Sequence, residues 1–387
     1  MPLSAISDNV FKGEGALSQL DTLIPKYKNI LLFNDRDGFA PCGALDYFLQ
    51  AEKKWKNRDN CRIQYVSYAG KALPVEDVEE KYREVQHNPG VDLIIAVGGG
   101  TVIDLAKIIS IAYSNNCEKV EEILFNKELE NKKDLIFIPT TAGTGSEATS
   151  FAVVYKDKVK FSIDNQSLLA DYIILDPLLL KSLPEPILNA TVLDALAQAI
   201  ESTWARGATA ESREYAKQAI KRILDHIDKK EGNAIDIDRL SQLQIASHLA
   251  GKAINISRTT LPHSISYPIT SHFGVPHGIA VFLTLPEVAE FNYYTSPGTA
   301  QEGIPEGHIR ESFSILFSLF KVERIEQLKE KLNNMMIKLK VNPRLSFYGI
   351  EEKDLPFLAA NALTKGRSDN NPRKVDSDGV LTLLTSL

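Results

Sequence analysis

Cysteine is scarce in this sequence, and the few cysteines present form no motif. Cys42, Cys61 and Cys117 are the only three among 387 residues, and no CxxC or CxxH pattern occurs. This usage argues against a disulfide framework and favours a reducing compartment. We therefore expect a cytoplasmic protein.

Long hydrophobic runs and a positive charge balance are also missing. No apolar segment approaches the roughly 20 residues that span a bilayer, and Met1 to Val10 lacks the pattern of a secretion leader. The net charge of −6 argues against nucleic-acid or anionic-membrane partners. A locally basic pocket for an anionic small molecule remains compatible with it. Hydrophobic residues at 44% and charged residues at 24% are typical of a soluble globular protein.

The first half of the chain alternates short apolar runs with helical segments. The strand-like runs are residues 29–33, 62–66, 92–97, 135–138 and 171–175, and residues 151–163 read as a hairpin. Near-continuous Val/Ile/Leu strands separated by helices predict a parallel sheet covered on both faces.

After Pro177 the apolar spacing becomes helical. The segments concerned are residues 184–204, 211–227, 237–254, 309–320 and 325–339. Because 387 residues are too many for one ordinary core, two domains are expected. We predict an α/β domain over residues 1–180 and an all-helical domain over residues 181–387.

Two glycine-containing loops follow predicted strands. Gly98, Gly99 and Gly100, with Thr101, lie between a strand and a helix, where the backbone can approach a phosphate closely. The second loop, from Pro139 to Glu147, offers hydroxyls at the carboxyl end of the next strand, where open α/β sheets bind ligands. A tight turn without a ligand remains the alternative for the first loop, and a plain helix cap for the second.

Neither loop has the GxGxxG pattern of the standard dinucleotide-binding fold. Asp35, just after the first strand, could bond an adenosine ribose, which favours NAD(H). Arg36 beside it suits a 2′-phosphate, so NADP(H) stays open.

Four polar residues in the second half could form a metal site. Asp194 and Gln198 share one face of a largely apolar helix, and His263 and His277 follow. Such oxygen and nitrogen donors suit a divalent cation such as Fe²⁺ or Zn²⁺. The alternative is that Asp194 is paired with another group of the protein and that the two histidines are structural. Four other histidines, at positions 87, 226, 248 and 308, lie in polar helical contexts and are expected on the surface.

These motifs, in this order, resemble the iron-containing alcohol dehydrogenase family over nearly the whole chain. The resemblance rests on Gly98–Gly100 with Asp104 and Lys107, the Pro139–Glu147 loop, Leu175-Asp176-Pro177, Asp194, His263 and His277-Gly278. It implies a dehydroquinate synthase-like fold with a dinucleotide-binding α/β domain, a helical metal and substrate domain, and a nicotinamide site in the cleft between them. Homo-oligomers are common in the family.

The resemblance also implies which residues act. The cofactor would contact Asp35, Gly98, Gly99, Gly100, Thr101, Asp104, Thr140, Thr141, Thr144 and Ser146. The metal would be held by Asp194, Gln198, His263 and His277. Two residues depart from the family's pattern: Gln198 stands where histidine is usual, and Tyr267 where a further histidine is frequent.

Residues 257–278 are most similar to phosphonoacetaldehyde reductases, which make 2-hydroxyethylphosphonate. Arg258 precedes His263 by five residues, and a guanidinium binds phosphonate oxygens as a fork. Arg258 and Tyr267 are therefore the expected substrate contacts, with a structural ion pair as the alternative for Arg258. The alternative functions are reduction of uncharged short aldehydes, a dehydroquinate synthase-like lyase reaction, and a degenerate binding protein.

Overall fold

The computed structural model describes residues 9–70, 72–126, 128–157, 159–227, 236–364 and 366–387. The chain divides into two compact units. One contains residues 1–184 with 231–248, and the other contains residues 185–230 with 249–387. The expectation about a secretion leader falls largely on residues 1–8, outside the described part.

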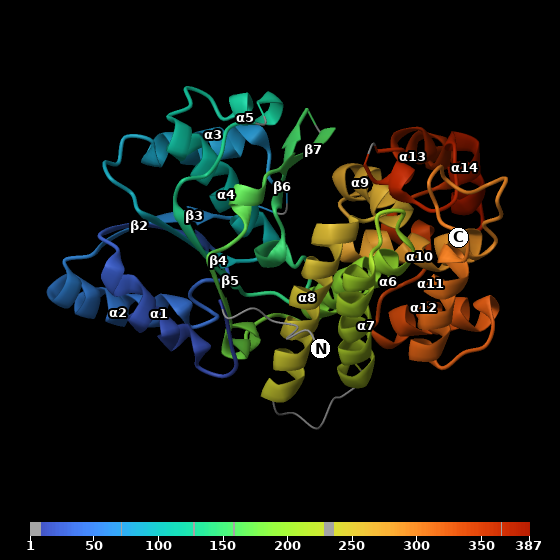
Figure 1. The fold of residues 1–387 in the computed structure, drawn as a ribbon, viewed down its shortest axis with the longest axis horizontal. Helices are drawn as coiled ribbons and strands as arrows, with labels where there is room; N and C mark the ends of the chain where they lie inside the picture. The colour runs from blue at the N-terminus through green and yellow to red at the C-terminus, as the bar shows by residue number, and fades with distance from the viewer. Residues whose placement is uncertain (1–8, 71, 127, 158, 228–235, 365) are drawn as a thin grey trace. The chain divides into compact units, whose positions relative to one another are not determined.

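A six-stranded parallel sheet forms the centre of the first unit (Figure 1). Its spatial order is β1 (Val10–Lys12), β8 (Tyr172–Leu175), β5 (Asp134–Pro139), β4 (Leu93–Gly98), β2 (Asn29–Asp35) and β3 (Arg62–Tyr68). An antiparallel hairpin, β6 (Phe151–Lys156) and β7 (Val159–Asp164), stands apart from the sheet. The predicted strands and hairpin are confirmed.

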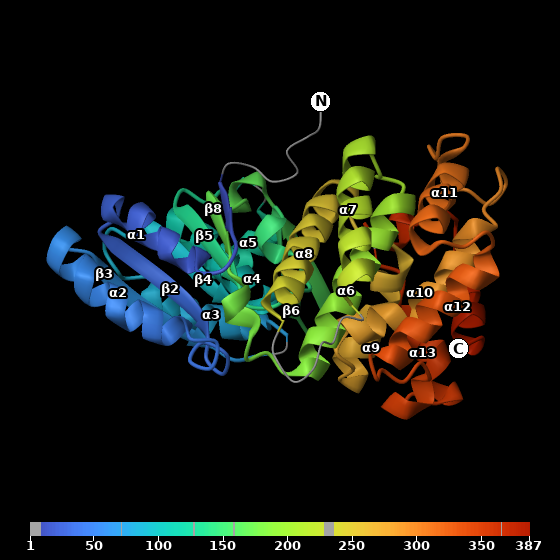
Figure 2. The same ribbon diagram turned by 90° about the horizontal axis from the view of Figure 1, so that it is seen from below.

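Helices cover both faces of this sheet (Figures 1 and 2). They are α1 (Leu20–Leu23), α2 (Ala44–Asp59), α3 (Val75–Val85), α4 (Gly100–Asn115) and α5 (Glu121–Phe125). Leu31 and Phe33 pack in one core with residues of α3 and α4, while Ile30 and Leu32, on the opposite face, are equally buried. Burial on both faces explains the continuous apolar runs, because a two-sided core leaves no polar alternation.

The order of the strands reverses beside β2. From β2 the chain adds β3 on one side, and then returns to place β4 on the other. Ligands of open α/β sheets bind at such a reversal, outside the carboxyl ends of the strands. The register pairs Asn34 with Val97, so Asp35 and Gly98 end neighbouring strands.

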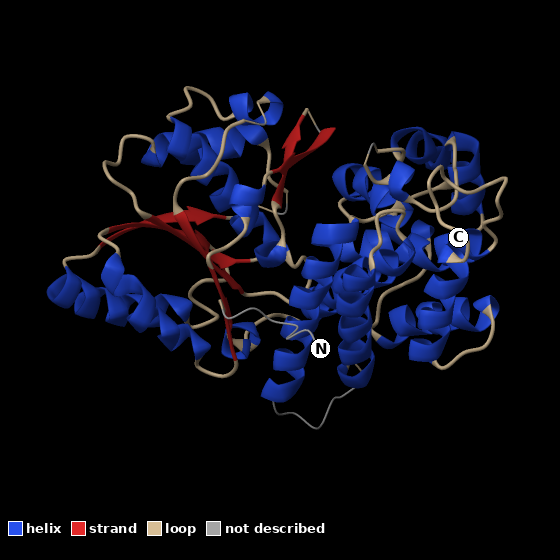
Figure 3. Ribbon diagram, viewed as in Figure 1, coloured by secondary structure: helices blue, strands red, loops and turns tan. Residues whose placement is uncertain are grey.

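The second unit is built from helices (Figure 3). They are α6 (Glu185–Trp204), α7 (Ala210–His226), the later part of α8 (Ile237–Ser257), α9 (Leu261–Phe273), α10 (His277–Tyr293), α11 (His308–Phe320), α12 (Ile325–Lys338), α13 (Leu355–Asn361) and α14 (Ser377–Thr385). Helix α10 packs against α6, α9 and α12 and is buried nearly all round, as expected of a central helix.

Within the described residues, every helix is too short or too polar to traverse a bilayer.

Candidate functional site

The glycine segment after β4 forms the turn that opens α4. A Cβ atom on Gly100 would lie 2.6 Å from the Thr144 Oγ1 atom, so only glycine lets the loop after β5 rest against this turn. The Thr140 N–H also donates to the Gly98 carbonyl oxygen at 3.1 Å. The two loops singled out in the sequence therefore meet at the N-terminus of α4, where free N–H groups and the helix dipole favour an anion.

A small cavity adjoins these loops at the carboxyl ends of β2, β3 and β4. It is lined by Asp35, Tyr68, Gly70, Gly99, Thr101 and Val102. The Arg36 side chain is exposed and lies 3.5 Å from the Asp37 carboxylate. Asp35 therefore lines this cavity, and a carboxylate suits the ribose hydroxyls of NAD.

Two buried charged side chains, Lys107 and Asp104, support the loop after β5. The Lys107 Nζ atom donates to the carbonyl oxygens of Ser146 (2.6 Å) and Phe151 (3.0 Å). The Asp104 carboxylate accepts from the Ser146 hydroxyl (2.5 Å) and the Val153 N–H (3.0 Å). Burial lowers the pKa of Lys107 to about 8, although the charge of Asp104 opposes the shift. These contacts hold the loop on α4. The Asp104 carboxylate therefore supports the loop by binding groups of the protein itself.

The first half of α8 supports the same loop. The Gln244 side chain donates to the Pro139 carbonyl oxygen at 3.0 Å, and His248 Nδ1 lies 3.3 Å from a Glu147 carboxylate oxygen. The expectation that His248 and His308 lie on the surface is wrong, since they are only 2% and 5% exposed. A polar helical context does not reveal burial when a distant segment supplies a partner for the ring, as Glu147 does for His248 and the Trp204 carbonyl oxygen does for His308.

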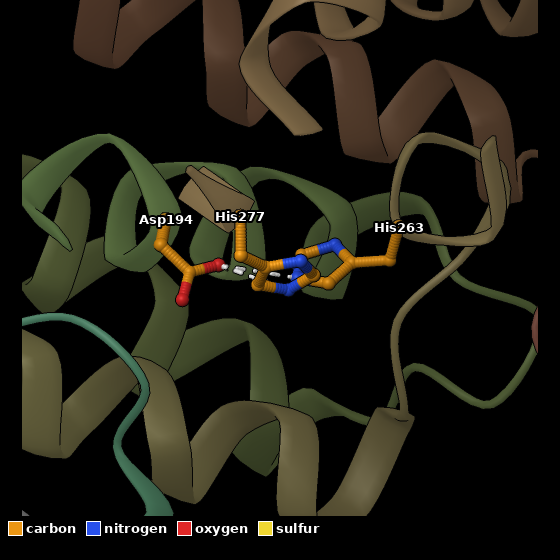
Figure 4. Close-up of side chains that lie close together, drawn as sticks. All are labelled: Asp194, His263 and His277. Carbon is orange, nitrogen blue, oxygen red and sulfur yellow. Dashed lines mark ion pairs between the residues drawn. The ribbon is translucent and has the colours of Figure 1, made fainter. Parts of the chain in front are cut away.

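Three side chains converge in the second unit, as Figure 4 shows. Asp194 comes from α6, His263 from the first turn of α9, and His277 is the first residue of α10. His263 Nε2 lies 3.3 Å and His277 Nε2 lies 3.9 Å from Asp194 Oδ1, and all three ligand atoms fall within 4.8 Å of one another. One carboxylate oxygen and two imidazole nitrogens are a donor set that fits a borderline divalent cation.

The two residues that depart from the family's pattern both adjoin this cluster. Gln198 lies one turn after Asp194 on α6 and is 3% exposed, so its amide shares the buried helix face. The Tyr267 ring stacks on the His277 ring, with 6.2 Å between centroids and 10° between planes. The phenol thus borders the cluster beside His277.

Glycine at position 278 allows α10 to approach α6 this closely. A Cβ atom there would lie 2.0 Å from the Ala190 carbonyl oxygen and 2.8 Å from Asp194 Cβ. Contact between the backbones of α10 and α6 is what carries His277 to Asp194. The sequence analysis did not assign Gly278 a role, and only its place next to His277 could have suggested one.

Glu201 is a functional residue that the sequence analysis missed. It lies seven residues after Asp194 on α6, hence on the same helix face, and is fully buried. One carboxylate oxygen is hydrogen-bonded to His263 Nδ1, and the other accepts from the Thr260 N–H (2.6 Å) and hydroxyl (2.8 Å). A carboxylate at Nδ1 orients the ring and leaves Nε2 to face Asp194.

The charges around His263 favour the protonated form of its ring. Burial by itself would lower the pKa of His263, but Glu201 and Asp194 outweigh it and raise this pKa to about 10. A proton or another cation therefore offsets the two buried carboxylates, which is the electrostatic setting of a cation site.

Arg258 occupies the turn between α8 and α9. Its backbone is left-handed, with φ at 61°, and its N–H donates to the Ile254 carbonyl oxygen at 2.9 Å. Non-glycine residues rarely adopt this conformation, and strained residues cluster at functional sites. The Arg258 Nη1 atom is buried. The turn thus places Arg258 three residues before α9, the helix that carries His263.

Comparison with known families identifies the chain. The family model described as iron-containing alcohol dehydrogenase matches residues 7–177. The family model for the C-terminal part of the Fe-containing alcohol dehydrogenase family matches residues 188–387. The chain therefore belongs to the iron-containing alcohol dehydrogenase family. It is an oxidoreductase that uses NAD(P) and a divalent metal.

Relatives within the family differ in their substrates. Phosphonoacetaldehyde reductase of Streptomyces viridochromogenes is 29% identical over 308 residues, covering 76% of this chain and 75% of the relative. NAD-dependent methanol dehydrogenase of Bacillus methanolicus is 31% identical over 284 residues, covering 73% of each. The crystal structure of a 1,3-propanediol oxidoreductase matches with a TM-score of 0.84 and 25% identity, covering 98% of this chain and 97% of that chain. The predicted fold class is confirmed.

Proposed function

We propose that this enzyme reduces a short aldehyde with an anionic head group to the primary alcohol. Its preferred substrate is phosphonoacetaldehyde, and the product is 2-hydroxyethylphosphonate. Arg258 carries this proposal, because a turn with left-handed backbone places it three residues ahead of α9, the helix that supplies His263. The similarity to the Streptomyces phosphonoacetaldehyde reductase supports it.

We assign the metal site to Asp194, Gln198, His263 and His277. Asp194 supplies the only negative charge among these four ligands, and Gln198 contributes a neutral amide oxygen. Glu201 holds the Nδ1 side of His263, so the Nε2 side is available to the ion. Bound there, Fe²⁺ or Zn²⁺ would act as a Lewis acid toward the substrate oxygen.

We assign the cofactor to the carboxyl ends of β2, β4 and β5. Direct contacts are proposed for Asp35, Gly98, Gly99, Gly100, Thr101, Thr140, Thr141, Thr144 and Ser146. Asp104 supports the site through its bonds to Ser146 and Val153. A reduced nicotinamide supplies the hydride. Because Asp35 lines the cavity and Arg36 points to solvent, we expect NADH to be preferred to NADPH.

Substrate selection follows from charge. The Arg258 guanidinium can hold two phosphonate oxygens in parallel hydrogen bonds, a geometry that an uncharged aldehyde does not offer. Tyr267 borders the ligand His277 and would contact the substrate from that side. The second candidate, reduction of uncharged aldehydes, is supported by the similarity to methanol dehydrogenase.

The test is a comparison of phosphonoacetaldehyde with propionaldehyde, following NADH and NADPH oxidation by the metal-loaded enzyme. Arg258→Ala should lower kcat/KM for phosphonoacetaldehyde about 10- to 150-fold, since a charge-assisted hydrogen bond contributes about 1.5–3 kcal/mol. Propionaldehyde reduction should change little. Arg310→Ala, which removes an exposed arginine of α11, is the matched control. Equal losses on both aldehydes would make Arg258 a structural residue and favour the second candidate.

A further inference from the structure

The Arg258 turn is held from outside by one residue of the C-terminal segment. The Asn370 side-chain Nδ2 donates to the Ser257 carbonyl oxygen (2.8 Å) and to the Thr259 carbonyl oxygen (3.0 Å). These carbonyls flank Arg258 on either side. The amide therefore binds the Ser257–Arg258 and Thr259–Thr260 peptide groups, on either side of the residue with the left-handed backbone.

Asn370 is also anchored to the segment that follows α6. Its side-chain Oδ1 accepts from the Gly207 N–H at 3.0 Å, and its main-chain carbonyl oxygen accepts from the Arg206 N–H at 2.8 Å. The side-chain amide therefore has two carbonyl acceptors at its nitrogen and one N–H donor at its oxygen, and these partners define its orientation. The segment after α6 thus fixes Asn370, and Asn370 fixes the turn.

Close packing leaves this turn little freedom. A Cβ atom on Gly207 would lie 2.9 Å from the Ser257 carbonyl oxygen. The Ser257 hydroxyl lies 3.0 Å from the Arg258 carbonyl oxygen, so three successive carbonyls from Ser257 to Thr259 have side-chain partners. Arginine pays a conformational penalty in this backbone region, and a turn of this kind persists only when its surroundings specify it.

The far end of the turn is tied to the metal ligand. Thr260 donates its N–H and hydroxyl to Glu201, the carboxylate that also bonds His263 Nδ1. Between Asn370 on one side and Glu201 on the other, Arg258 is held at a set position relative to His263. No side chain other than that of Asn370 bonds both carbonyls that flank Arg258 among the hydrogen bonds of the described residues.

We propose that Asn370 is a positioning residue for substrate selection: it fixes the Arg258 turn so that the guanidinium meets an anionic head group while the aldehyde faces the metal site. The inference rests on the proposed function, because it gives Asn370 no role toward an uncharged aldehyde. Asn370 acts through Arg258 and does not itself touch the substrate.

The first test is Asn370→Asp. The change keeps the acceptor for Gly207, removes both donors and brings a negative charge to the Ser257 and Thr259 carbonyls. We expect kcat/KM for phosphonoacetaldehyde to fall about 10-fold, chiefly through KM, as for the loss of one or two hydrogen bonds. Propionaldehyde kinetics should stay within about twofold of the wild type.

Asn361→Asp is the matched control. Asn361 is exposed on α13, and its amide donates to the Phe357 carbonyl oxygen of its own helix, at 2.8 Å. The Asn361→Asp variant should have the wild-type kcat/KM for both aldehydes. Asn370→Ala, which adds no charge, should reproduce the selective loss. If Asn370→Asp and Asn370→Ala lower activity on both aldehydes to the same extent, Asn370 is merely structural and the proposal is overturned.

The second test is a double-mutant cycle between Asn370→Ala and Arg258→Ala. If Asn370 acts through Arg258, its substitution should have no further effect on phosphonoacetaldehyde once Arg258 is alanine. Additive losses would overturn the proposal even if each single variant is selective. Failure of the proposed function would look different, because Arg258→Ala alone would then lower kcat/KM equally for both aldehydes.

Discussion

Replacing Gly278 with alanine would drive α10 away from α6. The new methyl group would lie 2.0 Å from the Ala190 carbonyl oxygen, whereas real Cβ atoms essentially never come within 3.0 Å of a neighbour. The helices must therefore separate locally by about 1 Å, since overpacked atoms move the backbone when no flexible side chain can yield. The preceding residue, His277, would move with the helix.

The expected loss is larger for metal binding than for folding. Overpacking of this kind costs about 1–3 kcal/mol in the free energy of unfolding. Ligand distances in a metal site tolerate only about 0.2 Å, and disturbing the surroundings of a ligand typically costs about 10- to 100-fold in affinity. We expect the Gly278→Ala protein to remain folded and to bind metal at least about 10-fold more weakly than the wild type.

Elemental analysis and competition with a chromophoric chelator measure the affinity, and urea unfolding measures the stability. Gly298→Ala is the control, because a Cβ atom at Gly298 meets nothing within 4 Å. A Gly278→Ala protein that binds metal as tightly as the wild type would refute the reasoning, and with it the claim that backbone approach sets the site.

Four further predictions follow from the two units. Glu201→Gln should weaken metal binding about 10- to 100-fold, because an amide cannot replace both acceptor contacts of the carboxylate; unchanged affinity in chelator competition would contradict this. Gln198→His should tighten metal binding where the helix face admits the ring, and elemental analysis of both proteins after dialysis checks it; equal or lower metal content would count against Gln198 as a ligand. Asp35→Gly should raise the kcat/KM ratio of NADPH to NADH about 10-fold or more, since it removes a like charge near the 2′-phosphate; a constant ratio would remove Asp35 from the cofactor site. Between about pH 8 and 10.5 the unfolded chain keeps the Lys107 proton that the folded chain has lost, so the wild type should gain stability relative to Lys107→Met as pH rises through this range; urea unfolding at several pH values tests the sign.

Elements with a one-dimensional pattern were predictable. The inner strands β2, β4 and β5 are buried on both faces, so each appears as a run of apolar residues, and Gly98 to Gly100 mark the turn into α4. The spacing of Asp194 and Gln198 placed both on one face of α6. Each of these features depends on residues within a few positions of one another.

Helices α9 and α10 were not anticipated as helices, and their composition explains why. Pro268 lies inside α9 and Pro286 inside α10, and an interior proline normally argues against a helix. Both helices are also buried on most sides, so their apolar residues show no single stripe. Packing against neighbouring helices outweighs the cost of the prolines.

The sequence by itself determined the family, the two-part organisation of strands and helices, and the residue types available for a metal and a dinucleotide. Only the tertiary structure decided which distant groups meet: Glu201 with His263 across 62 positions, and Asn370 with Ser257 across 113. A buried polar side chain must find a partner, but many partners would satisfy it equally well. The choice among them is made by the packing of helices, which brings backbones as close as Gly278 and Ala190 and which no local pattern records.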